Sequence, residues 1–156
     1  MMETSNIIIR PFSNAEEIPY DLLLLSDDTK EAIDKNLDKG ELYLGLQGDK
    51  IIAAFILKII QQDTVEIKNI AVSEDYQGKG IGTKLLDFIK KNVKQRGFHI
   101  LLVGTCDQCQ KEIEFYKKSD FTVIGIHKNF FLDNYKEAIF ENGKQIIDMI
   151  ILKKDL

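Results

Sequence analysis

The chain has 156 residues, 44% hydrophobic and 29% charged, a balance typical of one folded domain with a sizeable core. Its formal net charge of -4 argues against the basic surface of a nucleic-acid-binding protein. No secretory signal pattern opens the chain, and the longest apolar run, residues 51–60, is too short to span a bilayer. We therefore expect a single cytoplasmic domain over residues 1–156, with neither a nucleic-acid nor a membrane partner.

The N-terminal part of the sequence predicts one strand followed by two helices. Residues 7–10, three isoleucines and Arg10, are typical of a strand that ends at Pro11. Residues 14–26 carry acidic residues early and leucines later, which is typical of a helix, and Pro19 within them predicts a kink or two helical pieces. Thr29 is a suitable N-cap for a second short helix that ends near Gly40.

Three strand-like runs follow, at residues 42–46, 51–60 and 64–72. The connections between them, around residues 48–49 and 61–63, are only a few residues long. Connections this short join antiparallel neighbours, so we expect a three-stranded antiparallel unit here.

The pattern then changes to that of a helix. Apolar residues recur at spacings of three and four from Ile81 to Val93, and Gly97 follows as a helix end. Residues 99–103 form the next apolar run. A strand–helix–strand crossover predicts that this run lies parallel to residues 67–72.

The remaining sequence predicts a helix at residues 111–118 and two final strands at 121–126 and 145–152, separated by an aromatic loop at 127–135. The whole order of elements predicts an α/β (α+β) fold. We expect a mixed, mostly antiparallel central sheet of about seven strands with helices on both faces.

The most informative motif is a loop with glycine at every second position, Gly78, Gly80 and Gly82, between a strand and a helix. It does not match the Walker loop, and the dinucleotide fingerprint would need a glycine at Thr83. A diphosphate needs several backbone donors at one point, and glycines leave room for that approach. We expect the N–H groups from Gln77 to Thr83 to point toward such a ligand, the alternative being a plain tight turn.

The pattern Gln/Arg-x-x-Gly-x-Gly/Ala, matched by Gln77, Gly80 and Gly82, resembles the Gcn5-related N-acetyltransferase (GNAT) superfamily. The resemblance implies acetyl-coenzyme A as co-substrate and no metal. It also implies that the pyrophosphate lies at the glycine loop and that the pantetheine arm pairs with the preceding strand end. The cofactor-binding residues expected from it are Ile70, Ala71, Val72, Gln77, Gly78, Lys79, Gly80, Ile81, Gly82 and Thr83.

A second motif, Phe115 to Phe121, is similar to the family signature Phe-Tyr-x-Lys-x-Gly-Phe, with Asp120 in place of the glycine. The resemblance implies that Tyr116 is the general acid that protonates the departing coenzyme A thiolate, and a phenol is able to supply that proton. The alternative is a tyrosine that only caps the core.

Glu66 lies where the family strand carries a glutamate, five residues before its Ala-Val pair. Amines are mostly protonated at neutral pH, so the reaction needs a proton acceptor. Glu66 is the candidate base, acting through a water. The alternative is a strand-surface carboxylate paired with Lys68.

Candidate acceptor-binding residues are the polar Asn69 and the residues His127, Phe130, Phe131 and Tyr135 of the aromatic loop. Aromatic ring faces can hold a cation. The alternative is that these rings only attach the loop to the core.

Cys106 and Cys109 form a Cys-x-x-Cys sequence. A redox pair or half of a zinc site would explain it, but we favour ordinary reduced cysteines in a loop. In many members of the family an Asn that contacts the cofactor stands at the position of Cys109.

These motifs together predict an acetyl-CoA-dependent N-acetyltransferase that moves the acetyl group directly to an amine of a small molecule or peptide in a ternary complex. The alternatives are a non-catalytic acyl-CoA sensor and a protein N-terminal or lysine acetyltransferase. A homodimer formed through the final strands is a further hypothesis.

Overall fold

The computed structural model describes residues 6–156. Seven strands form its central sheet: β1 (Ile7–Pro11), β2 (Glu41–Gln47), β3 (Lys50–Gln61), β4 (Thr64–Val72), β5 (Ile100–Cys106), β6 (Thr122–His127) and β9 (Met149–Asp155). The helices are α1 (Tyr20–Leu23), α2 (Lys30–Leu37), a 3-10 turn η2 (Glu74–Tyr76), α3 (Ile81–Gln95), α4 (Gln110–Lys118) and α5 (Phe130–Asn134). A two-stranded hairpin, β7 (Phe140–Glu141) and β8 (Lys144–Gln145), lies outside the sheet.

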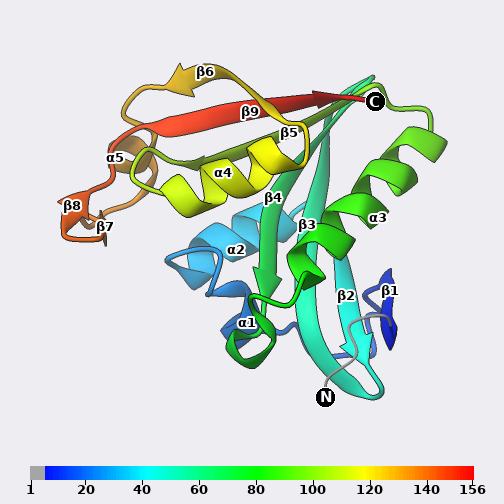
Figure 1. Ribbon diagram of the computed structural model, residues 1–156. Helices are drawn as coiled ribbons and strands as arrows, with labels where there is room; N and C mark the ends of the chain where they lie inside the picture. The colour runs from blue at the N-terminus through cyan, green and yellow to red at the C-terminus, as the bar shows by residue number, and fades with distance from the viewer. Residues whose placement is uncertain (1–5) are drawn as a thin grey trace.

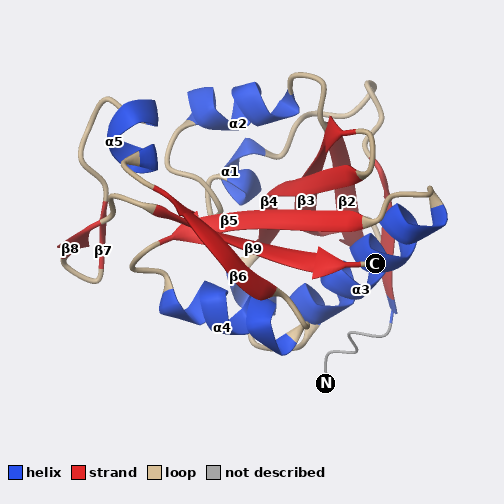
Figure 2. Cartoon of the chain, turned by 90° about the horizontal axis from the view of Figure 1, so that it is seen from above, coloured by secondary structure: helices blue, strands red, loops and turns tan. Residues whose placement is uncertain are grey.

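The strand order is β1-β2-β3-β4-β5-β9-β6 (Figure 1). Within the described residues β4 and β5 pair in parallel, and the other neighbours in this sheet pair antiparallel. Helices α1 and α2 cover one face, whereas α3 and α4 cover the other (Figure 2). The mixed, mostly antiparallel sheet expected from the sequence is confirmed.

The prediction of a helix over residues 14–26, kinked or in two pieces, is wrong except for its later part. Only α1 forms, and Pro19 lies directly before it rather than within it. Proline has no N–H to donate and disfavours a helical conformation in the residue before it, so the helix begins only after Pro19. Upstream, Glu16 donates its N–H to the Ser13 carbonyl and its carboxylate pairs with Arg10, which makes a turn instead.

The second helix, α2, is confirmed with its cap. The Thr29 side chain accepts a hydrogen bond from the Ala32 N–H at 3.1 Å. This bond satisfies one of the unpaired donors at the start of the helix.

The last strand also begins later than expected. Residues 144–145 pair in the β7–β8 hairpin, whose turn contains Asn142 and Gly143 at positive φ, so β9 starts only at Met149. The aromatic loop contains the helix α5, which the sequence pattern did not indicate.

Helix α3 is held to the sheet by the apolar face that its sequence predicts. Its buried residues are Ile81, Leu85, Leu86, Ile89 and Val93, and they pack with the strand residues Phe55 and Ile67. Burial of each such side chain contributes about 1.5–3 kcal/mol, so this face fixes α3 on the sheet. Gly97, with a φ of +93°, ends the helix as expected. No helix within residues 6–156 has the length and apolar character needed to cross a membrane.

The parallel pairing of β4 with β5 covers only part of each strand. It joins Thr64–Ile67 to Ile100–Val103 and stops there. Opposite β3, Ile67 pairs with Leu57 and Asn69 with Ile56, so Lys68 is an extra residue in β4. A bulge of this kind bends the strand, and beyond it β4 and β5 diverge (Figure 1). The parallel direction expected from the sequence is confirmed, but the pairing lies before Lys68 rather than after it.

A buried amide joins β4 to the α1–α2 face. The Asn69 side chain donates to Ser26 Oγ at 3.0 Å and accepts from Asn36 Nδ2 at 2.8 Å. Asn69 is only 3% exposed, so these bonds are shielded from water. The network fixes the turn after α1 and the last turn of α2 against the sheet.

Asn69→Ala should lower the free energy of unfolding by about 1–3 kcal/mol, because the two partner groups lose a buried hydrogen bond. Urea denaturation measures this. The control is Asn92→Ala, which removes a partly exposed amide on α3 and should change stability by less than about 0.5 kcal/mol. Equal losses in the two variants would contradict the structural role of Asn69.

Candidate active site

The divergence of β4 and β5 opens one edge of β4 within the sheet. From Asn69 to Val72 this strand is paired on the β3 side, whereas the second half of β5 pairs with β9. Such an edge can accept an extended, amide-bearing chain in the manner of an added strand. The glycine loop follows at the end of the same strand.

The glycines of this loop serve two different purposes. Gly78 and Gly80 have φ values of +73° and +83°, a region that residues with a Cβ rarely adopt, and a Cβ at either position would meet no protein atom. A Cβ on Gly82, in contrast, would lie 3.1 Å from the ring of Phe115. Gly78 and Gly80 thus shape the loop, and Gly82 allows α3 to approach α4 closely.

The loop leaves backbone donors at the start of α3. The first hydrogen bond of the helix runs from the Lys84 N–H to the Gly80 carbonyl, at 3.2 Å. The N–H groups of Ile81, Gly82 and Thr83 precede it and lie at the positive end of the helix dipole. This end of a helix is a suitable site for a phosphate group.

Gln77 has a different role from the one expected. Its N–H donates to the Glu74 carbonyl at 3.3 Å, and its side chain donates to the Val72 carbonyl at 2.9 Å. The backbone N–H of Gln77 is therefore engaged within the protein. Gln77 connects the loop to the end of β4, and the N–H groups at the start of α3 lie after it.

Tyr116 lies on the inner face of α4. It is 5% exposed, and its ring contacts Phe121 and Phe115 at centroid distances of 5.6 Å and 5.2 Å. Burial raises the pKa of the phenol, and the nearby Glu112 carboxylate raises this pKa further. The hydroxyl is therefore protonated at neutral pH, as a proton donor must be.

The turn after α4 needs a residue at positive φ, and Asp120 takes the place of the glycine found there in the family signature. Asp120 adopts a φ of +70° and donates its N–H to the Lys117 carbonyl, while Phe121 donates to the Tyr116 carbonyl. Aspartate tolerates this conformation better than most residues do. The turn at this position therefore forms without a glycine.

Glu66 lies on β4, before the bulge. Its carboxylate is 3.1 Å from the Lys68 ammonium, and its side chain is 19% exposed. The ion pair with Lys68 that the sequence analysis offered as an alternative is thus present. It does not prevent Glu66 from accepting a proton through a water, since part of the side chain reaches the surface.

The aromatic candidates form one continuous row. The rings of His127 and Phe130, of Phe130 and Phe131, and of Phe131 and Tyr135 are 5.1, 5.1 and 5.8 Å apart. The Tyr135 hydroxyl donates to Asp27 at 2.6 Å. The structure therefore brings these four residues together and places their end beside the α1–α2 connection.

Sequence reasoning missed two acidic residues at that end of the row, Asp27 and Asp28. Burial and the neighbouring Asp27 and Glu141 raise the pKa of Asp28, and burial and the bond to Asp27 raise that of Tyr135. In the sequence, two adjacent aspartates between two predicted helices were the feature that could have indicated these residues. Asn69, in contrast, is a member of the buried amide network, with both polar groups of its side chain engaged.

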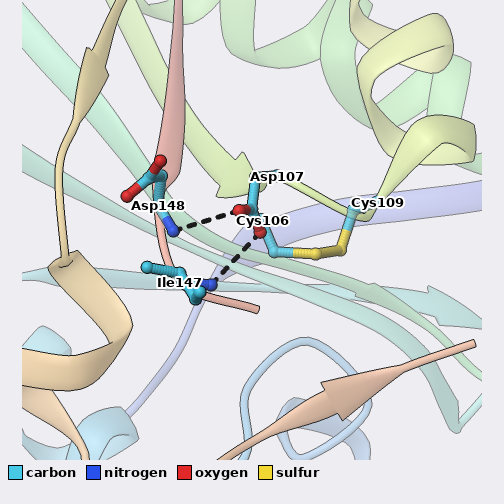
Figure 3. The surroundings of a disulfide bond; sticks show 5 residues. All are labelled: Cys106, Asp107, Cys109, Ile147 and Asp148. Carbon is cyan, nitrogen blue, oxygen red and sulfur yellow. Dashed lines mark hydrogen bonds between the residues drawn. A yellow bond between two sulfur atoms is a disulfide. The ribbon is translucent and has the colours of Figure 1, made fainter. Parts of the chain in front are cut away.

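The expectation of ordinary reduced cysteines is wrong, because Cys106 and Cys109 form a disulfide (Figure 3). The turn between β5 and α4 brings their Cα atoms to 5.1 Å, within the range that a disulfide spans. Within residues 6–156 no group of three or more His, Cys, Asp or Glu side chains is arranged to hold a metal ion.

Comparison with known proteins identifies the family. A model of the "Acetyltransferase (GNAT) family" matches residues 3–121. The chain is 42% identical over 138 residues to the "Uncharacterized N-acetyltransferase YvbK" of Bacillus subtilis, and the match covers 88% of each protein.

Two solved structures show the same fold. A GNAT family acetyltransferase from Elizabethkingia anophelis with acetyl-CoA bound is 44% identical, with a TM-score of 0.94 over 97% of this chain and 99% of that one. A Bacillus subtilis acetyltransferase in complex with CoA is 37% identical, with a TM-score of 0.88 over 96% and 99% of the two chains. The chain is therefore a member of the GNAT family of acetyltransferases.

Proposed function

We propose that this acyltransferase moves the acetyl group of acetyl-CoA directly to the amine of a small molecule or peptide, and that residues 1–156 act as one catalytic domain. One arrangement carries the proposal: the open edge of β4 leads into the positive-φ glycine loop and then into the N-terminus of α3. The buried phenol of Tyr116 lies on the neighbouring helix α4. Related structures with acetyl-CoA and CoA bound support it.

The protein would hold acetyl-CoA at two places. The N–H groups of Ile81, Gly82 and Thr83, with those of Gly78 and Gly80, would bind the pyrophosphate. The backbone edge from Ile70 to Val72 would pair with the pantetheine amides. An N–H near Val72 would then stabilise the thioester oxygen as negative charge develops on it.

The chain's own side chains would move two protons. Glu66, through a water, would accept the proton of the attacking amine, and Tyr116 would donate its hydroxyl proton to the leaving thiolate. The amine attacks the acetyl carbon, the carbon–sulfur bond breaks, and an amide and a free thiol result. No covalent intermediate with the protein is required.

The aromatic row would form one wall of the acceptor site. Ring faces attract cations, and the aspartate pair at the α1–α2 connection adds negative charge at its end. This combination favours a small amine that carries a second positive group. A sensor that only binds acyl-CoA would keep the glycine loop and show no turnover with any amine.

A panel of amines assayed for thiol release from acetyl-CoA tests the proposal, with Tyr116→Phe as the key variant. Loss of the proton donor should lower kcat by about 100-fold or more and leave acetyl-CoA affinity nearly unchanged. The matched control is Tyr43→Phe, in which the same hydroxyl is lost from a buried tyrosine stacked on Phe55. An unchanged kcat in Tyr116→Phe would remove its assignment as the acid.

Gly80→Ala should weaken acetyl-CoA binding by about tenfold, because a Cβ at φ +83° adds ~1.4 kcal/mol of strain that the free loop relieves by leaving the binding conformation. Calorimetric titration measures this. Gly97→Ala is the control, because it imposes similar strain, at φ +93°, on the opposite end of the same helix. If both variants bound acetyl-CoA as tightly as the parent, the loop would not be the phosphate site.

Glu66→Gln should lower kcat by about 100-fold, since the amide cannot accept the amine proton. Lys68→Met tests whether the ion pair alone matters, because it removes the partner and keeps the carboxylate. Steady-state kinetics should show a much smaller change for Lys68→Met. Equal losses would mean that Glu66 acts through the ion pair and not as a base.

A further inference from the structure

The Cys106–Cys109 disulfide lies at the junction of β5 and the helix that carries Tyr116. Cys106 is the last residue of β5, and Cys109 is the residue directly before α4. Tyr116 follows two turns along the same helix. Opening or closing of the disulfide therefore acts on the start of the helix that positions Tyr116.

The junction is held by other contacts as well as by the disulfide. The Cys109 N–H donates to the Cys106 carbonyl at 3.1 Å, and the Ile113 N–H donates to the Cys109 carbonyl at 3.1 Å. Asp107, between the two cysteines, accepts from the N–H groups of Ile147 and Asp148, both at 3.3 Å (Figure 3). These bonds do not depend on the sulfur atoms, so the turn can persist when the disulfide opens.

A disulfide over so short a loop also adds less stability than one that closes a long loop. The stabilisation that a crosslink gives by restricting the unfolded chain grows with the number of residues it encloses, and here only two residues separate the cysteines. Stabilisation of the fold is therefore a weak explanation for this bond. Reversible opening is the alternative that its position supports.

The two sulfur atoms are not equivalent. Cys106 is 4% exposed, whereas Cys109 is partly exposed. Cys109 also precedes the first turn of a nine-residue helix, whose N–H groups favour a thiolate there. Two carboxylates oppose this effect, Glu112 in the first turn and Asp107, although Asp107 directs both oxygens to the backbone of residues 147–148.

We propose that Cys106 and Cys109 form a reversible dithiol–disulfide site, with Cys109 as the sulfur that exchanges with external thiols and Cys106 as the resolving thiol. In reduction, an external thiolate attacks the Cys109 sulfur, the disulfide breaks, and Cys106 leaves as a thiolate. The second thiol of the reagent displaces Cys109. The reagent becomes a disulfide, and the protein gains two electrons and two protons.

The site would also control acetyl transfer, a consequence that rests on the proposed function. In the disulfide form, the start of α4 is attached covalently to β5. Reduction removes that crosslink, so that α4 and Tyr116 are positioned only by the backbone of residues 107–109, the hydrogen bonds of the turn and the packing of Ile113 and Tyr116. We expect turnover to fall several-fold on reduction, through kcat rather than through acetyl-CoA affinity.

The thiol test uses the folded full-length chain and mass spectrometry after alkylation. The chain purified without reductant should show no alkylated cysteine, and the native chain incubated with dithiothreitol should show two, with unchanged circular dichroism. Reaction only after unfolding would overturn the proposal in favour of a structural disulfide. Two free thiols that mild oxidation fails to join would overturn it as well.

Single variants test the order of the two thiols. Cys106→Ser leaves Cys109 and should form a mixed disulfide with oxidised glutathione about tenfold faster than Cys109→Ser does, since exposure and thiolate character both favour Cys109. Equal or reversed rates would contradict the assignment. These measurements need no enzymatic activity, so their failure is distinct from a failure of the proposed function.

Turnover is compared by following acetylated product in the oxidised and reduced chains. A lower kcat in the reduced chain, absent when dithiothreitol is added to the Cys106→Ala/Cys109→Ala variant, supports the coupling to α4. Equal kcat values in the two forms would overturn the coupling. No turnover in either form would instead overturn the proposed function.

Discussion

The divergence of β4 from β5 is the constraint on which the candidate site depends. An extra residue, Lys68, bends β4 away from its parallel partner after Ile67. The pairing of β9 along the whole of β5 holds that strand in place on its other side. Within residues 6–156, the divergence leaves the backbone N–H and C=O groups in the later part of β4 without a strand partner on the β5 side. Inside a sheet, such groups normally bond to the neighbouring strand. The glycine loop and the start of α3 stand at one end of this opening, and α4 follows directly from β5.

Different parts of the molecule keep this opening fixed. On one face, the apolar side of α3 packs on Phe55 and Ile67, so the N-terminal donors of the helix are held by a buried core. On the other face, Asn69 attaches α1 and α2 to the same strand. A site built on such a frame can present backbone groups to a ligand with little rearrangement, which lowers the cost of binding.

Local patterns in the sequence predicted much of this arrangement. The periodicity from Ile81 to Val93 predicted α3, Thr29 predicted the start of α2, and short connections predicted the antiparallel unit. The bulge at Lys68 could not be predicted, because it depends on the register between two strands and leaves no mark in either one. The effect of Pro19 was underestimated, because a kink or two helical pieces were expected there, whereas only the short α1 forms, directly after this proline.

In the candidate site, too, residues within continuous motifs were predicted, and contacts between distant residues were not. The glycine loop and Tyr116 lie in continuous motifs, so one sequence was enough to find them. The contact between Tyr135 and Asp27 joins residues more than 100 positions apart in the chain, and no local pattern indicates it. The disulfide depends on the turn geometry between Cys106 and Cys109, which sequence spacing permits but does not determine.

The most direct test of the central claim is an NMR titration of the backbone amides with coenzyme A and, separately, with pantetheine, which lacks the diphosphate. If the start of α3 binds the diphosphate, coenzyme A should shift the amide signals of Gly80, Ile81, Gly82 and Thr83, and pantetheine should leave them nearly unchanged. Coenzyme A binding that leaves these four signals in place would contradict the account.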